Sequence, residues 1–247
     1  MVELATAEIL ALGLAALLIG ISKTALPGAG TLSVAIFATV LPARQSTAAI
    51  LLLLLVGDVI AVWTYRRDAD FAALRRLIPT VLVGMVVGAT FLYFADDTIM
   101  RRAIGAILLA LTLLTLLLMQ RGVLSDHTTL TSPKVRGVYG TLGGFTTMAA
   151  NAGGPVMTLY FLAARFDVVR LVATQAWFFF TVNVLKLPFS LGIGLLNVKV
   201  LPILAALAPV VIIGGLIGRR WIVRMNQTWF NRVIVVLTIL SCLYLLR

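Results

Sequence analysis

The sequence contains little of the chemistry on which most enzymes and metal sites depend. Its 247 residues include one cysteine, Cys242, and one histidine, His127. A disulfide within the chain, a CxxC redox pair, a Cys/His metal cluster and a Cys/His nucleophile are therefore excluded. The sequence also lacks a GxxxxGK[ST] phosphate loop and an HExxH motif. We therefore expect no catalytic residue, no metal and no cofactor.

Charged residues are also scarce. They make up 12% of the chain, hydrophobic residues make up 61%, and the mean hydropathy is +1.09. Soluble domains are about one quarter charged, so this composition predicts a single transmembrane domain over residues 1–247. The net charge of +11 is typical of Lys and Arg retained in cytoplasmic loops. We expect the lipid bilayer as a partner, and no nucleic acid.

Ten apolar runs without strand alternation predict an all-α fold. The runs are Leu4–Ile21, Thr31–Leu41, Ser46–Tyr65, Phe71–Phe94, Thr98–Met119, Val135–Ala150, Pro155–Ala164, Val168–Leu191, Val200–Ile217 and Thr228–Leu246. Glu3 precedes the first run, Glu8 lies within it, and no basic segment comes before it, so we expect it to belong to the mature protein. One polar connection, residues 122–134, separates five runs from five and contains His127, which we expect to be solvated.

The halves on either side of this connection resemble each other, which indicates an internal duplication. The matching positions, in order, are Gly20–Gly30 (GISKTALPGAG) with Gly144–Gly154 (GFTTMAANAGG), Thr47 with Thr174, Gly84 and Gly88 with Gly214 and Gly218, and Thr98 and Arg102 with Thr228 and Arg232. We therefore predict a first repeat over 1–121, a linker over 122–134 and a second repeat over 135–247.

Loop charges decide whether these repeats are parallel or inverted. If each Gly/Pro-interrupted segment crossed the membrane once, Lys and Arg would be divided almost equally between the two faces. If each segment instead turns near the midplane and returns, most of the basic loop residues fall on one face. That face carries Arg66, Arg67, Arg75, Arg76, Arg121, Lys134, Arg136, Arg165, Arg170, Arg219, Arg220 and Arg224. The opposite face carries only Arg44, Arg101, Arg102, Lys199 and Arg247. The positive-inside rule favours this second arrangement. We predict an all-α integral membrane protein of two inverted repeats, each with a re-entrant or broken helical hairpin plus three transmembrane helices, and both termini outside.

Residues 23–30 and 146–155 interrupt the apolar sequence with glycine, proline and polar side chains. Irregular backbone is not tolerated against lipid, so each break must be buried or line a watery cavity. Pro155 is expected at the first position of a helix, and two such helix N-termini facing each other at the midplane would bind an anion. The predicted substrate-binding residues are Lys23, Thr24, Pro27, Gly28, Gly30, Thr147, Asn151, Gly153, Gly154 and Pro155. The alternative is close helix packing, which explains Gly84, Gly88, Gly214 and Gly218 better than it explains a lysine, an asparagine and two prolines at duplicated breaks.

Asp58 and Lys186 lie inside apolar runs, where a charge is costly unless it is paired or hydrated. The repeat alignment puts them one position from equivalence, so inversion would direct one toward the cytoplasm and the other toward the outside. Asn183 shares a helical face with Lys186, and Gln175 lies about two turns earlier. We interpret these four residues as a polar path or coupling site, with a buried structural pair or a snorkelling lysine as the alternative. For Asp58 a carboxylate held ionised by a cation such as Lys23 or Lys186 is preferred to a proton carrier. We expect the aromatic residues 177–180 to face lipid or to pack.

Several segments carry a family resemblance. They are the duplicated small-residue turns, Asp58–Asp70 (DVIAVWTYRRDAD), Asn151–Phe161 (NAGGPVMTLYF) and the pair Asn183 and Lys186. In order and spacing they resemble the sulfite exporter TauE/SafE family over nearly the whole chain. The resemblance implies a multi-pass protein of the inner (cytoplasmic) membrane that exports sulfite or a related small organosulfur anion, such as sulfoacetate, by alternating access. The residues themselves indicate an anion, and only the resemblance indicates sulfur.

Other functions stay open at this point. The chain could import another small anion such as a carboxylate, or it could be the membrane subunit of an enzyme complex, including a lipid-modifying enzyme with a separate catalytic partner. Export of an anion is favoured by an inside-negative potential, which contributes about 2.3 kcal/mol per charge per 100 mV, so uniport is sufficient. The direction of transport, the coupling ion and the choice between a monomer and a homodimer are not determined by the sequence.

Overall fold

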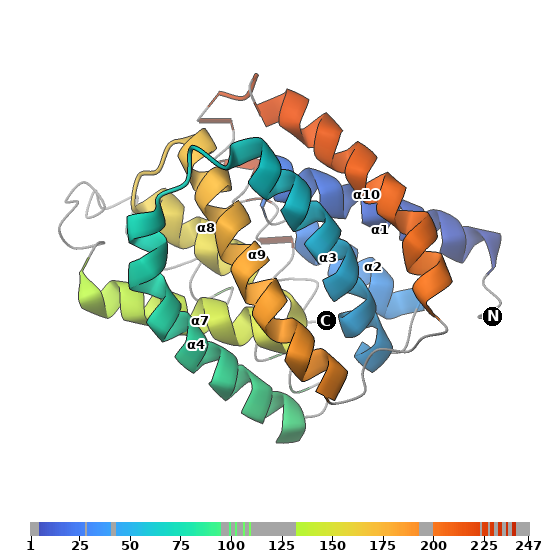
Figure 1. The fold of residues 1–247 in the computed structure, drawn as a ribbon, viewed down its shortest axis with the longest axis horizontal. Coiled ribbons are helices and arrows are strands. Elements are labelled where there is room, and N and C mark those ends of the chain that lie inside the picture. The colour runs from blue at the N-terminus through green and yellow to red at the C-terminus, as the bar shows by residue number, and fades with distance from the viewer. Residues whose placement is uncertain are drawn as a thin grey trace. The chain divides into compact units, whose positions relative to one another are not determined.

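The computed structural model is helical throughout the part of the chain that it describes, as the apolar runs predict. It describes residues 5–27, 29–40, 43–94, 132–192, 200–222 and 224–226, together with isolated positions between 99 and 109 and between 228 and 240. The helices are α1 (Thr6–Thr24), α2 (Ala29–Val40), α3 (Ala43–Tyr65), α4 (Phe71–Phe94), α7 (Pro133–Ala150), α8 (Gly153–Ala163), α9 (Val168–Gly192) and α10 (Leu201–Ile222) (Figure 1).

These helices begin and end close to the bounds of eight of the predicted apolar runs. Helix α7 begins at Pro133, inside the predicted linker, because Ser132 caps it. The Ser132 Oγ accepts a hydrogen bond from the Val135 N–H at 3.4 Å, and a proline is well suited to the first helical position. The runs Thr98–Met119 and Thr228–Leu246 lie mostly outside the described residues, and His127 lies entirely outside them.

The helix lengths fit a membrane protein with two broken hairpins. Among the described residues, α1, α4, α9 and α10 each contain a stretch long and apolar enough to cross a bilayer. Helices α2 and α8 have 12 and 11 residues. At 1.5 Å per residue they extend about 16 to 18 Å, roughly half of a 30 Å hydrocarbon core. The segments α1–α2 and α7–α8 therefore each join a longer helix to a half-length helix, and the two helices of each segment pack against each other.

The chain forms two compact units. The first contains Met1–Ala69 and Val172–Met225, and the second contains Asp70–Leu171 and Asn226–Arg247. Within the first unit α1 packs against α2, α3 and α10, and within the second α7 packs against α4 and α8. Each unit therefore combines segments from both sequence halves, whereas the predicted repeats follow the order of the chain.

Glycine brings α1 and α10 into backbone contact within the first unit (Figure 1). A Cβ atom added at Gly20 would collide with the carbonyl oxygen of Val211, and one at Gly214 with that of Leu17. Close approach of this kind is the usual way for helices to associate in lipid, where no hydrophobic force drives them together. The adjoining core is mostly aliphatic and includes Leu12, Ile19, Leu53, Leu204 and Leu207 together with Phe37.

The second unit uses the same device between α4 and α7. A Cβ atom at Gly84 would collide with the Thr141 carbonyl oxygen, and one at Gly144 with the Val81 carbonyl oxygen. One turn further along α4, Gly88 lies against the backbone of Phe145. These glycines therefore allow close helix packing. This is the role that we considered the better explanation for Gly84, Gly88, Gly214 and Gly218.

Candidate functional site

Lys23 lies in the last turn of α1, immediately before the first break. The helix ends there because the N–H groups of Ala25 and Leu26 both donate to the Ile21 carbonyl, at 2.8 and 3.2 Å, which turns the chain away from the helix axis. Helix α2 then begins at Ala29. A cation at the C-terminal end of a helix interacts favourably with the helix dipole. The sequence therefore places a lysine where the backbone itself favours positive charge.

The Lys23 ammonium forms an ion pair with Asp58 of α3. The Lys23 Nζ lies 2.6 Å from one carboxylate oxygen of Asp58, and the Asn183 side-chain amide of α9 donates to the other at 2.6 Å. The Asp58 side chain is 0% exposed, and that of Lys23 is 10% exposed. A buried carboxylate is tolerated when both of its oxygens are compensated in this way. Lys23 is one of the two cations that we expected beside Asp58, and the structure places it in direct contact with that carboxylate.

Lys186 adds a second buried cation to this cluster. It lies on α9 one turn after Asn183, is 2% exposed, and is close enough to Asp58 and Lys23 to interact electrostatically with both. We expected Asp58 and Lys186 to point toward opposite sides of the membrane, whereas the structure brings both into the same cluster of the first unit. Gln175, about two turns earlier on α9, is also buried. The cluster thus contains two ammonium groups and one carboxylate among its described ionisable residues.

Two of the aromatic residues of α9 are part of the cluster's surroundings. The Lys23 Nζ lies 4.8 Å from the centre of the Phe179 ring, within the range of a cation–π interaction. Phe179 packs edge to face with Phe178 at 4.9 Å between ring centres, and both are buried. The expectation that these rings pack is confirmed for Phe178 and Phe179. No signal in the sequence indicates the contact between Phe179 and Lys23, because the two residues belong to different helices.

Thr24 connects three helices of the first unit. Its hydroxyl donates to the Gly215 carbonyl of α10 at 2.9 Å and lies 3.2 Å from the Gly20 carbonyl, while the Tyr65 hydroxyl of α3 donates to the Thr24 carbonyl at 2.7 Å. Because a hydroxyl has one hydrogen to donate, the group that we expected at the anion stabilises helix packing in this state. Tyr65 was missed, although it lies in the Asp58–Asp70 segment.

The other residues of the first break have backbone and packing roles. Pro27 is buried, and Gly30 is partly buried in the first turn of α2. A Cβ atom at Gly30 would lie 3.0 Å from the Ser22 Oγ, so a side chain there would crowd the end of α1. Gly28 lies outside the described residues.

The second break is a two-residue turn in the second unit. Helix α7 ends because Asn151 adopts the left-handed conformation, with φ 52° and ψ 24°, which asparagine tolerates better than most residues. The Asn151 N–H donates to the buried Thr147 carbonyl at 3.0 Å, and the Ala152 N–H to Thr146 at 3.1 Å. These bonds satisfy carbonyl groups that a helix end otherwise leaves without partners.

Helix α8 begins at Gly153, two residues before the predicted start. Pro155 is therefore its third residue rather than its first, a position at which the missing N–H still has no partner within the helix. Ala152 precedes the helix and forms no side-chain cap. Gly153 and Gly154 thus present a helix N-terminus without side chains, as an anion-binding turn requires.

Comparison with known proteins identifies the family. No curated relative and no solved structure matches the chain. The family model described as "Sulfite exporter TauE/SafE" matches residues 12–245, which include both breaks and the Lys23, Asp58 and Asn183 cluster. With four helices able to span a membrane in the described part of the chain and a family match over nearly its whole length, the chain belongs to the sulfite exporter TauE/SafE family of multi-pass membrane transporters.

Proposed function

We propose that the protein is a secondary transporter that exports sulfite or a related small organosulfur anion across the cytoplasmic membrane. The family supplies the transporter class and the sulfur chemistry. One observation supports an anionic substrate: Lys23, Lys186 and Asp58 lie together, largely buried, beside the first break. When all three are ionised, the described ionisable groups of the cluster carry one positive charge in excess. In a site of low effective dielectric, such a charge attracts an anion more strongly than it would in water.

Lys23 is the residue that we assign to the substrate. It is the most exposed of the three charged residues, and it adjoins the break. Asp58 is a positioning residue, because it holds the ammonium group and is itself held by Asn183. This pairing supports the structural role that we preferred for Asp58. Since the membrane potential alone drives anion export, uniport stays the simplest coupling scheme.

The second break supplies the second anion-binding element of this proposal. Gly153 and Gly154 begin α8 without a side-chain cap, so the N–H groups of the first turn and the positive end of the helix dipole are suited to an oxyanion. Asn151 and Thr147 adjoin this N-terminus and complete the set of residues that we predict to contact substrate.

Alternating access between inverted repeats is the mechanism that we propose, and the packing contacts support the duplication. The alignment that pairs Gly20 with Gly144 also pairs Leu17 with Thr141, and the one that pairs Gly84 with Gly214 also pairs Val81 with Val211. The contacts within the two units follow this pairing. Gly20 lies against Val211 in the first unit, and the paired residues Gly144 and Val81 are in contact in the second. Likewise Gly214 lies against Leu17, and Gly84 lies against Thr141. The inverted orientation follows from the distribution of loop charges.

A transport assay tests the function. Purified protein in liposomes should release labelled sulfite along an imposed potential, with no partner protein added. The same assay applies to variants that lack the Lys23 charge. For these, Arg75→Gln, at an exposed position of α4, is the control for a general effect of losing a positive charge. No flux above that of empty liposomes, with folded protein, would favour a membrane subunit that needs a partner. Flux of a small carboxylate in preference to sulfite would overturn the substrate class.

A labelling assay tests the topology. Single cysteines replace Arg165 and Lys199 in a protein that lacks Cys242. We expect an impermeant thiol reagent to reach the two positions from opposite sides of the membrane. Labelling of both from the same side would rule out inverted repeats.

A further inference from the structure

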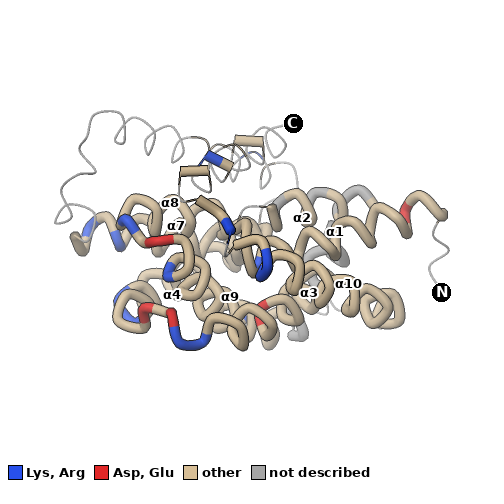
Figure 2. The backbone as a smooth tube through the Cα atoms, turned by 90° about the horizontal axis from the view of Figure 1, so that it is seen from above, with Lys and Arg blue, Asp and Glu red and all other residues tan. Residues whose placement is uncertain are grey.

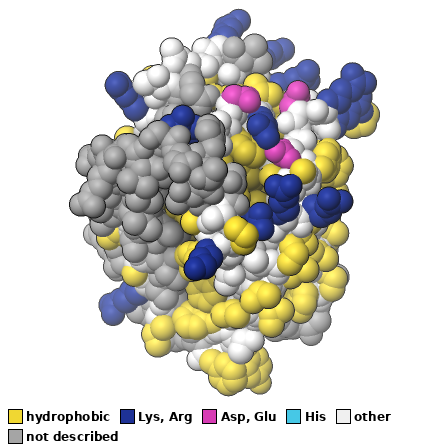
Figure 3. Space-filling view, turned by 90° about the vertical axis from the view of Figure 1, so that its left-hand side faces the viewer, with side chains coloured by type: hydrophobic (Ala, Val, Ile, Leu, Met, Phe, Trp, Pro, Cys, Tyr) yellow, Lys and Arg dark blue, Asp and Glu magenta, His cyan; other side chains and the backbone are white. Residues whose placement is uncertain are grey.

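The second unit contains a pocket that the transport proposal does not use. Its volume is about 330 Å³, and its lining comes from the start of α4, the start of α7, the end of α8 and the beginning of α9. The polar lining residues are Asp70, Arg76, Arg136, Tyr160, Arg165 and Arg170, and the remainder are alanine and phenylalanine. Figure 2 marks basic positions at the ends of α4 and α7, and Figure 3 shows basic and acidic side chains gathered beside apolar ones.

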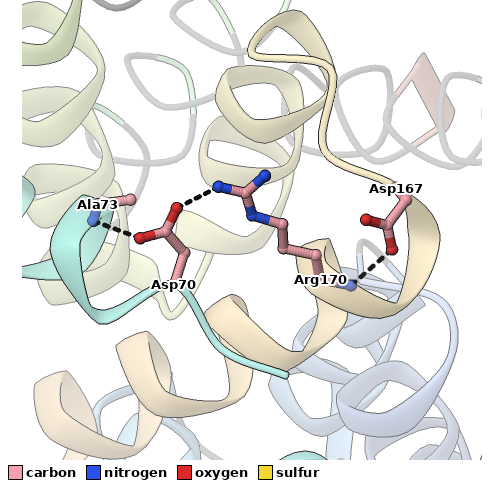
Figure 4. Close-up of polar contacts among 4 residues, drawn as sticks. All are labelled: Asp70, Ala73, Asp167 and Arg170. Carbon is pink, nitrogen blue, oxygen red and sulfur yellow. Dashed lines mark hydrogen bonds and ion pairs between the residues drawn. The ribbon is translucent and has the colours of Figure 1, made fainter. Parts of the chain in front are cut away.

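Asp70 and Arg170 both line the pocket, and Figure 4 shows the contact between them. Asp70 caps α4 by accepting the Ala73 N–H at 2.9 Å, and its other oxygen pairs with the Arg170 guanidinium. Asp167 caps α9 by accepting the Arg170 N–H at 3.0 Å, and the Arg170 guanidinium lies 4.2 Å from the centre of the Phe166 ring. The single carboxylate that lines the described pocket is thus already bound to a helix end and to one arginine.

The pocket therefore carries excess positive charge, because four arginines face that one carboxylate. Arg165 is held by the turn that ends α8, where it adopts a φ of 56° and the Phe166 N–H donates to the Phe161 carbonyl at 3.0 Å. Arg76 and Arg136 approach from two other helices, near the Tyr160 hydroxyl. A guanidinium group binds phosphate oxygens in pairs, so convergent arginines with a hydroxyl donor are suited to a phosphate group.

The location of the pocket indicates where that phosphate comes from. Helix α4 has the length and composition of a membrane span, and its apolar residues Phe71, Val83 and Val86 are largely exposed. A site at the end of such a helix lies at the depth of lipid headgroups, and basic pockets between membrane helices bind anionic headgroups. We propose that this pocket binds the phosphate headgroup of an anionic phospholipid, with Arg76 and Arg136 as principal ligands and Tyr160 as a further donor.

The test measures thermal unfolding of the purified full-length protein in detergent, with phosphatidylglycerol or phosphatidylcholine added. The variant Arg76→Gln with Arg136→Gln removes two pocket charges. The matched control, Arg75→Gln with Lys134→Gln, removes two exposed charges from the same helices outside the pocket. We expect phosphatidylglycerol to raise the melting temperature of the wild type and the control, and the pocket variant to need at least about tenfold more of this lipid. Tyr160→Phe, which removes only a hydroxyl, should weaken the effect less.

Native mass spectrometry should show phosphatidylglycerol retained by the wild type and the control but lost from the pocket variant. An equal loss in the pocket variant and the control would show a general surface-charge effect and overturn the proposal. So would stabilisation of the wild type by inorganic phosphate or glycerol phosphate alone to the same extent as by phosphatidylglycerol, because the oxyanion would then come from solution. These outcomes do not depend on sulfite transport.

Discussion

Removing either member of the Lys23 and Asp58 pair should affect the protein unequally. At 2.6 Å and an effective dielectric constant of about 20, the attraction between the two charges is roughly 6 kcal/mol, offset by several kcal/mol of desolvation for each buried ion. The net contribution of the intact pair is therefore small. Removing one partner of a buried pair costs about 3 to 5 kcal/mol where no other group compensates the charge that remains.

The second lysine of the cluster determines which variant is less stable. Lys23→Met leaves the Asp58 carboxylate with the Asn183 hydrogen bond and with Lys186 as a nearby positive charge. Asp58→Asn leaves Lys23 and Lys186 as two like charges, of which Lys186 is 2% exposed. We therefore expect Asp58→Asn to be the more destabilising single substitution. The double variant should be more stable than Asp58→Asn, because one ammonium group remains in the cluster instead of two.

Thermal unfolding of the four proteins in detergent measures this coupling, and sulfite transport in liposomes separates stability from function. The double variant should fold and yet bind sulfite roughly ten- to a hundredfold more weakly, since the charge-assisted bond from Lys23 is gone. A double variant as unstable as the sum of the single ones would show that the pair does not form. A double variant with normal sulfite affinity would show that Lys23 does not contact the substrate.

Three further predictions concern the helix contacts, the second break and the loops. Gly20→Ala should destabilise the protein by about 1 to 3 kcal/mol or more, because the added Cβ would meet a backbone carbonyl. Gly13→Ala, on the same helix with open space around it, should be neutral or stabilising. The melting temperatures of the two variants test this difference. Gly154→Leu should abolish sulfite flux at normal expression, because it fills the N-terminus of α8, and normal flux would move the site elsewhere. Burial raises the pKa of Asp70, but hydrogen bonds from the Ala73 N–H and Arg170 outweigh it and hold that pKa below the ordinary 3.8. The resulting stabilisation is complete above pH 3.8 and is lost as the pH falls through the lowered pKa. This stabilisation is under about 1 kcal/mol, because the Arg170 side chain is half exposed. The melting temperature of Asp70→Asn should therefore depend less on pH in an acid titration than that of the wild type.

Much of the fold could be predicted because it depends on local composition. Apolar runs gave eight of the helices, since a backbone in lipid must satisfy its own hydrogen bonds and does so within each helix. Glycine, proline and asparagine marked both breaks, because these residues end helices by their own backbone preferences. One local signal was overlooked: Pro79 of α4 and Pro209 of α10 occupy equivalent positions in the two halves and lie inside helices.

The tertiary structure decided which polar residues meet. Lys23, Asp58 and Asn183 come from α1, α3 and α9, and no spacing along the chain relates them, so the sequence indicated Lys23 or Lys186 as the cation beside Asp58 without choosing between the two. The same holds for the Thr24 hydroxyl, which donates to a carbonyl of α10 far along the chain. Helix formation in a membrane is a property of each segment, and the sequence determines it directly. The pairing of buried charges depends on which helices pack together, because a charge takes its partner from the neighbours that packing brings within reach of a hydrogen bond.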